Sequence, residues 1–306
     1  MRLRPSVLVA GGAILIVAVA VIVGVFRTIT RPPEPPEKEK PGQEAPATHL
    51  EMEGLKLRDT DEQGRLKWEV ESSGKLDVDP DTMTATGRDV KWVLVRGDGS
   101  RLVLQAPEFT ASREQIALTK GVTARSSDGS LDFEASGVTF DTRTQHLHAT
   151  GPLKAKVGDY ELQADDLGFD RPSTSIRLVG HVVLGYQQYE VTAGAVSVEQ
   201  SQRYALLTGG PRLSHADYSA RADTIKVDGV KEEVRLIGKI RIAAEGLEAR
   251  AARATLLGKQ RRAELTGGVS ISSDALEAQA QSLTIDFAAT TVTLTGRVRG
   301  TASTRL

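Results

Sequence analysis

Residues Ile176 to Leu184 read IRLVGHVVL, with apolar side chains at every second position on either side of a central glycine. The same pattern returns at residues 234–242 (VRLIGKIRI) and 263–271 (AELTGGVSI). Alternation with a period of two is typical of a β-strand with one buried face. The glycine falls on the apolar face in mid-strand, where it normally marks a bend or a close approach. These stretches therefore predict long, half-buried strands that bend at a glycine.

Two residue types recur at a fixed spacing along the chain. Glycines recur after one interval of 30 residues and then five of 29, at Gly121, Gly151, Gly180, Gly209, Gly238, Gly267 and Gly296. Alanines recur at intervals of 29 residues, at Ala106, Ala135, Ala164, Ala193, Ala222, Ala251 and Ala280. Two markers that keep step over this distance indicate a repeat architecture with units of about 29 residues.

Each unit reads as two strands. Around the alanine, apolar residues stand at positions −2 and 0 and then at +3 and +5, as in Leu162, Ala164, Leu167 and Phe169. This change from even to odd spacing predicts a one-residue bulge in the alanine strand. An acidic residue and a short polar stretch follow, which predicts a turn, at Asp141, Asp170, Glu199, Asp228 and Asp286.

Three all-β architectures could use such units: a closed barrel, a parallel β-helix, and an open antiparallel sheet that folds over so that two faces meet along one side. Long strands that bend and bulge, two to a unit, favour the folded-over sheet. A β-helix usually has shorter strands and ladders of identical side chains, which are weak here. We expect this all-β fold over residues 50–172 and 173–306.

The first 49 residues predict a membrane anchor and a linker. Residues 6–26 form an uncharged run of 21 residues flanked by arginines, and about 20 apolar residues suffice to cross a bilayer. No small-x-small cleavage site follows, so we expect an uncleaved transmembrane helix with residues 1–5 in the cytoplasm. Residues 27–49 hold six of the twelve prolines among charged side chains, which predicts an extended periplasmic linker.

Composition and motifs exclude several classes of function. With 39 basic and 40 acidic side chains the net charge is −1, which gives no broad basic surface for nucleic acid. The absence of cysteine excludes a disulfide scaffold and thiolate chemistry. No catalytic triad or phosphate-binding loop stands out, so we expect neither an enzyme nor a cofactor. His146 and His148 have no third clustered ligand, so we expect no metal site.

The apolar face predicts a lipid-sized trough. Aromatic residues make up only 4% of the chain, so an interior of Gly, Ala, Val and Leu leaves room between the two faces of the folded sheet. The candidate lining residues are Leu153, Leu178, Val182, Leu184, Leu207, Leu213, Leu236, Ile240, Ile242, Leu265, Val269 and Ile271. The last expected strand, residues 291–299, carries Val292, Leu294 and Val298 and has the unpaired backbone groups that strand addition needs.

Several motifs resemble lipopolysaccharide-export proteins. Residues 52–70 (MEGLKLRDTDEQGRLKWEV), the hairpin at Gly97–Gly99, residues 104–107 (LQAP) and residues 116–122 (IALTKGV) resemble the LptC family over about residues 5–170. From about residue 173 the repeats resemble the LptA/OstA-like periplasmic domain. The chain is longer than an LptC, which normally stops near residue 190.

The resemblance implies a periplasmic folded-over sheet, called a β-taco or β-jellyroll, that carries lipopolysaccharide acyl chains. Such a protein would sit in the inner membrane by a single helix. It would receive lipid from an inner-membrane ABC transporter and pass it by strand addition to an LptA-like or outer-membrane OstA/LptD-like protein. Two other functions stay open from the residues alone: an anchored structural or adhesive repeat protein without a ligand, and a β-helix enzyme acting on carbohydrate.

Overall fold

The computed structural model describes residues 50–302, apart from residues 61–65, 80–81, 83, 96–99, 113, 142, 171, 217, 245, 274–275, 287 and 290. The expected transmembrane helix (6–26) and linker (27–49) lie outside the described residues. Every regular element described is a β-strand, so the expected all-β class is confirmed. None of the described residues belongs to a helix of sufficient length and apolarity to span a membrane. The chain divides between Pro172 and Ser173 into two compact units.

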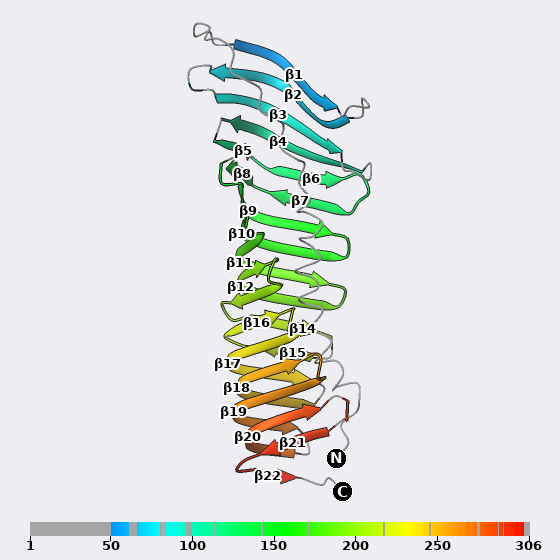
Figure 1. The fold of residues 1–306 in the computed structure, drawn as a ribbon, viewed down its shortest axis with the longest axis vertical. Coiled ribbons are helices and arrows are strands. Elements are labelled where there is room, and N and C mark those ends of the chain that lie inside the picture. The colour runs from blue at the N-terminus through cyan, green and yellow to red at the C-terminus, as the bar shows by residue number, and fades with distance from the viewer. Residues whose placement is uncertain are drawn as a thin grey trace. The chain divides into compact units, whose positions relative to one another are not determined.

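The N-terminal unit is an antiparallel meander in which each strand pairs with its neighbours in the chain (Figure 1). Two of its strands are each split in two, so that β5 and β6 both pair with β4, and β7 and β8 both pair with β9. Its strands are β1 (Leu50–Thr60), β2 (Leu66–Asp79), β3 (Thr84–Val95), β4 (Arg101–Ala111), β5 (Gln115–Thr119), β6 (Val122–Ser126), β7 (Leu131–Ala135), β8 (Gly137–Asp141), β9 (His146–Val157) and β10 (Tyr160–Asp170).

The C-terminal unit has the same antiparallel order (Figure 1). Here β13 and β14 both pair with β12, β15 and β16 both pair with β17, and β21 and β22 both pair with β20. Its strands are β11 (Ser175–Tyr186), β12 (Tyr189–Glu199), β13 (Tyr204–Thr208), β14 (Arg212–His215), β15 (Tyr218–Arg221), β16 (Thr224–Asp228), β17 (Glu233–Ala244), β18 (Leu247–Leu257), β19 (Arg262–Ser273), β20 (Leu276–Asp286), β21 (Thr291–Thr295) and β22 (Arg299–Ala302).

Strand starts keep a constant interval. Strands β9, β11, β13, β17, β19 and β21 begin at residues 146, 175, 204, 233, 262 and 291, each 29 residues after the last. The residue before five of these strands is not glycine and yet has a φ between 49° and 57°: Gln145, Thr174, Arg203, Glu232 and Arg261. The chain therefore leaves each of these turns through one left-handed residue, which sets the direction of the following strand.

Each long strand bends at the recurring glycine. All seven recurring glycines have a positive φ, between 75° and 98°. Opposite Gly180, the register passes from Val179–Ala195 to Val182–Ala193, so two residues of β11 face one residue of β12. The surplus residue thus lies in the glycine strand. Our prediction of a bulge in the alanine strand was therefore wrong. The extra residue lies in the glycine strand, where Gly180 and His181 together stand opposite one residue of β12.

The bend divides every strand of the C-terminal unit into two arms. The first arm ends at the turns of residues 200–203, 229–232 and 258–261, and the second arm ends at the hairpins near residues 187, 216 and 246. Apolar side chains of both arms share one buried face, for example Leu178 in the first arm and Leu184 in the second. Neighbouring residues on the opposite face are exposed and charged or polar, such as Arg177.

Acidic residues close the first-arm turns as expected. In Asp228, Oδ1 accepts hydrogen bonds from the backbone N–H of Val230 (3.1 Å) and Lys231 (2.9 Å). Asp286 Oδ1 accepts in the same way from Ala288 (2.9 Å) and Ala289 (2.8 Å). The hydrogen bond from Lys231 N–H lowers the pKa of Asp228, because it favours the carboxylate form. The turn prediction is confirmed at these two residues.

Candidate functional site

The buried face of the C-terminal unit is a set of straight apolar rows that run across the strands. In the first arm, one row joins residues that are directly opposite each other on successive strands from β11 to β21. Its members are Leu178, Val196, Leu207, Ile225, Leu236, Ala254, Leu265, Leu283 and Leu294. Each contact falls between adjacent strands about 4.8 Å apart, so side chains in the row form one continuous apolar strip.

The second arm carries a matching row on the same face. Register from β11 to β20 joins Leu184, Val191, Leu213, Ala220, Ile242, Ala249, Ile271 and Ala278. Large side chains come from the glycine strands and mostly small ones from the alanine strands. At about 4.8 Å per strand, a row across eight strands is about 34 Å long. A third, shorter set lies beside the bend: Val182, Ala193, Ile240, Ala251, Val269 and Ala280.

The residues that the sequence proposed as trough lining fall on these rows. Four lie in the first-arm row (Leu178, Leu207, Leu236, Leu265), four in the second-arm row (Leu184, Leu213, Ile242, Ile271), and three beside the bend (Val182, Ile240, Val269). Leu153 takes the bend position in β9 of the N-terminal unit, where it faces Ala164. All are buried, between 0 and 7% exposed, apart from Ile242, which is half-buried.

The row residues that come from the alanine strands were not among those predicted to line the trough. Val196, Ile225 and Ala254 stand between the proposed leucines and complete the strip. Their signal was present in the −2, 0, +3, +5 spacing around each alanine, but which of those residues oppose the glycine strand depends on the bend register. That register is set by backbone conformation at the glycine and its successor, and the amino-acid types do not reveal it.

The edge of the C-terminal unit exposes apolar side chains. Within the described residues, β21 and β22 pair with β20 and with no other strand. The predicted single strand over residues 291–299 was wrong: β21 ends at Thr295 and β22 begins at Arg299, so Val298 lies between the two strands. Val292 is 38% exposed and Val298 is 50% exposed, while Leu294 is half-buried. Leu294 faces Leu283, and Val292 faces Ile285 beside it. No further described strand follows β21 in the sheet, and this leaves the two side chains partly or fully accessible.

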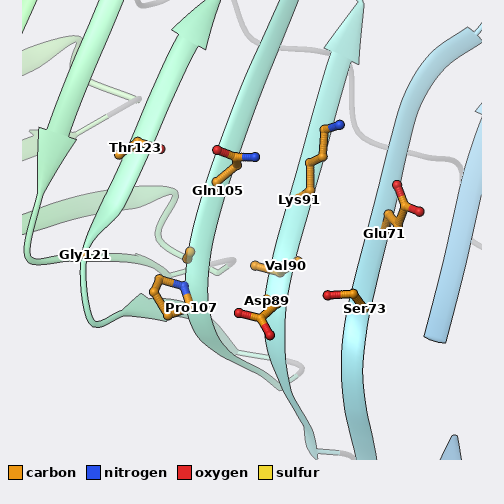
Figure 2. Close-up of a pocket in the computed structure, with 10 residues that line it drawn as sticks. Glu71, Ser73, Asp89, Val90, Lys91, Gln105, Pro107, Gly121 and Thr123 are labelled. Atoms are coloured by element: carbon orange, nitrogen blue, oxygen red, sulfur yellow. The ribbon is translucent and has the colours of Figure 1, made fainter. Parts of the chain in front are cut away.

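Two surface grooves differ from the apolar rows because charged side chains are among the residues that line them. One, of about 530 Å³, lies beside the bend of the N-terminal unit (Figure 2). Glu71, Asp89, Lys91 and Gln105 line it, together with buried Val90 and Ala106. The other, of about 250 Å³, is lined chiefly by charged side chains of β7, β9 and β10.

The paired histidines lie on β9, and one of them contacts an aspartate of β10. His148 Nε2 lies 2.6 Å from Asp166 Oδ2, within hydrogen-bonding distance, and both side chains are about 40% exposed. In the described part of the chain, no three or more His, Cys, Asp or Glu side chains are placed to hold a metal ion.

Comparison with known proteins gives the family. Residues 132–304, more than half of the chain, match the family described as LptA/(LptD N-terminal domain) LPS transport protein. No curated protein matches. Among solved structures, LptH of Pseudomonas aeruginosa, described as the LptA homologous periplasmic component of the lipopolysaccharide transport device, is 12% identical. That match covers 39% of this chain and 96% of LptH, with a TM-score of 0.35. On the family match, this chain belongs to the LptA/LptD N-terminal domain family of lipopolysaccharide transport proteins.

Proposed function

We propose that this protein is a periplasmic component of lipopolysaccharide transport that holds acyl chains between the two arms of its sheet. The observation that carries the proposal is the pair of apolar rows, which run in register across the C-terminal unit on one face. A surface of this kind binds lipid tails anywhere along its length, because apolar burial has no directional requirement. A tail would therefore slide along the rows without losing a specific contact.

The proposal also assigns roles to the N-terminal residues, to the N-terminal unit and to the edge of the C-terminal unit. Residues 6–26 would anchor the protein in the inner membrane, and residues 27–49 would hold the sheet in the periplasm. The N-terminal unit would act as the LptC-like domain that receives lipid from the ABC transporter. The 29-residue intervals would reflect copies of one two-strand unit. An LptA-like or OstA/LptD-like partner would add its own strand at the edge that carries Val292 and Val298.

Loading requires the arms to part. The row residues are almost fully shielded, with Leu178 at 0% and Leu236 at 1% exposed, so a tail must replace contacts that the side chains make with one another. Burial of a lipid CH₂ group contributes about 0.8 kcal/mol, and tail contacts substitute for side-chain contacts of the same apolar kind. The exchange is therefore close to neutral in free energy, which suits a carrier that must also release its cargo.

The same burial favours one alternative, a membrane-anchored structural or adhesive repeat protein whose interior is filled by its own side chains. Such a protein would have the same sheet and the same apolar rows, but the rows would serve only as core. The two functions differ in whether a lipid ever reaches the rows, and that difference can be measured directly.

Site-specific photocrosslinking in a host that makes lipopolysaccharide separates the two. A photoreactive residue at Ile242 or Leu256, which are half-buried on the apolar face, is expected to capture lipopolysaccharide. The same residue at exposed Arg177 or Lys226, on the opposite face of the first arm, serves as the matched control and is expected to capture none. Equal labelling at both faces, or none at either, would favour the filled structural core.

A further inference from the structure

Four arginines of the C-terminal unit stand directly opposite one another on neighbouring strands. Arg212 of β14 faces Arg221 of β15, Arg221 faces Arg241 of β17, and Arg241 faces Arg250 of β18. With strands about 4.8 Å apart, the row spans about 14 Å. We call these four residues the arginine row. They lie on the second arm, on the face opposite the apolar row, since Leu213, Ile242 and Ala249 next to them point inward.

The arginine row carries an uncompensated charge. Glu248 accepts hydrogen bonds from Arg241 and, at 2.6 Å, from Arg250 Nε, and these contacts lower the pKa of Glu248. No acidic side chain of the described residues forms an ion pair with Arg212 or Arg221. Glu190, which faces Ser214 two residues along β14 from Arg212, is a second carboxylate beside the row. Four arginines beside two glutamates leave an excess of two positive charges, on a chain whose net charge is −1. Like charges directly opposite each other in a sheet are destabilising.

Several cations on the outer face of the first arm form ion pairs. On its outer face Arg235 pairs with Glu233, Lys231 with Asp228 and Arg262 with Glu264. Each of these cations has its own carboxylate within the sheet or turn. The arginine row differs from these three pairs because it places four cations directly opposite one another on successive strands, two of them without an ion pair among the described residues.

The surroundings of the arginine row suit a small anionic group. The next outward residues along the strands are Ser214, Ser219 and Ala243, which are directly opposite one another and small. Glu190 faces Ser214 at one end of this line and Glu248 faces Ala243 at the other, so the small residues lie between two carboxylates. The large exposed apolar side chains of the described residues lie elsewhere, at Val230, Ile237, Val292 and Val298. A protein interface normally has an apolar centre, whereas guanidinium forks match phosphate oxygens in pairs.

We propose that the arginine row binds phosphate groups on the headgroup of the lipopolysaccharide whose tails lie between the arms. This inference rests on the proposed function and adds the headgroup contact to it. Arg241 lies three residues before Ala244, the last residue of β17, which is about 10 Å along the strand. A headgroup that leaves the arms at this end is therefore close to the long arginine side chains. Successive rungs 4.8 Å apart would let phosphates move from one arginine to the next.

The test compares two double variants of the full chain. R212Q/R221Q removes the two arginines without an internal partner and so breaks no ion pair. The matched control is R177Q/K226Q, which removes two exposed cations from the first arm. Binding of lipopolysaccharide, of enzymatically dephosphorylated lipopolysaccharide and of vesicles of anionic phospholipid is measured for each, at low and at physiological salt.

R212Q/R221Q is expected to weaken binding of the phosphorylated lipid on the order of tenfold at low salt, less at higher salt, as for two exposed arginine contacts. Binding of the dephosphorylated lipid, and all binding by R177Q/K226Q, should match the unaltered protein. If R212Q/R221Q bound the phosphorylated lipid as the unaltered protein does, or if both double variants lost the same amount of binding, the arginine row would not be a phosphate site. The transport function would still stand. Failure of every protein to bind either lipid would overturn both. Loss confined to vesicles of anionic phospholipid would assign the row to a membrane surface instead.

Discussion

Two adjacent glycines in β19 share a left-handed backbone conformation but differ in the room for a side chain at the bend. Gly267 and Gly268 both have positive φ, 86° and 78°. A Cβ on Gly267 would lie 2.7 Å from the Cβ of Ala252, whereas a Cβ on Gly268 would meet nothing within 4 Å. The residues that follow the recurring glycine in β17 and β11 correspond to Gly268: they are Lys239 and His181, with φ of 36° and 44°. The second bend position thus accepts a side chain, and the first does not.

We expect G267A to destabilise the protein by about 2–4 kcal/mol, from left-handed strain plus overpacking against Ala252. G268A should cost about 1 kcal/mol, from strain alone. Urea unfolding of the two variants measures the difference. The double variant G267A/A252G should recover the overpacking part, because Gly209 already lies against Gly194 in this way. Equal losses for G267A and G268A would contradict the role of close approach.

At the scale of single elements, the strands could be predicted from the sequence, but the backbone conformation of the turns between them could not. Alternating residues such as those of β17 and β19 predicted the strands and the buried face. The turn-closing role of Asp228 was also predictable, because Asp favours turns for a local hydrogen-bonding reason. By contrast, left-handed Arg203 and Glu232 carry no signal, since neither residue type favours that conformation.

The edge strands of the C-terminal unit make a prediction about association. Val292 of β21 and Val298, between β21 and β22, are exposed, and among the described strands β21 and β22 pair with β20 alone. We expect the full chain to associate with increasing concentration, because an unpaired edge with apolar side chains accepts another strand. V292K/V298K should reduce this association, since lysine on an edge strand opposes pairing. Sedimentation velocity measures the change.

The matched control for the edge is V230K. Val230 is 59% exposed, but it lies in a turn rather than on the edge strands. If association came from exposed apolar side chains in general, V230K would reduce it as much as the edge variant does. Strand addition instead requires V230K to behave like the unaltered protein.

At the scale of the whole molecule, the constant interval of strand starts predicts that one segment of 29 residues can be removed. Residues 204–232 span 29 positions and comprise β13 to β16, and the strands on either side, β12 and β17, would meet after their deletion. The new junction places Arg203 before Glu233 in place of Glu232, and both residues have nearly the same φ, 52° and 54°. The row partners also correspond, because Val198 faces Ala205 and the residue 29 positions later is Val234. Nearest-neighbour contacts of this kind make stability close to a sum over units.

We therefore expect the deletion of residues 204–232 to give a folded protein with a shorter sheet. Its circular dichroism per residue should be unchanged, and its Tm should fall by less than about 10 °C. Deletion of residues 204–217 removes fewer residues but only β13 and β14, so the first-arm end of β12 would have to continue into β15, which starts at the second-arm end. The strand direction would then be wrong, and we expect this shorter deletion to unfold the C-terminal unit. If instead the two deletions were equally disruptive, the 29-residue interval would not be the unit from which the sheet is built.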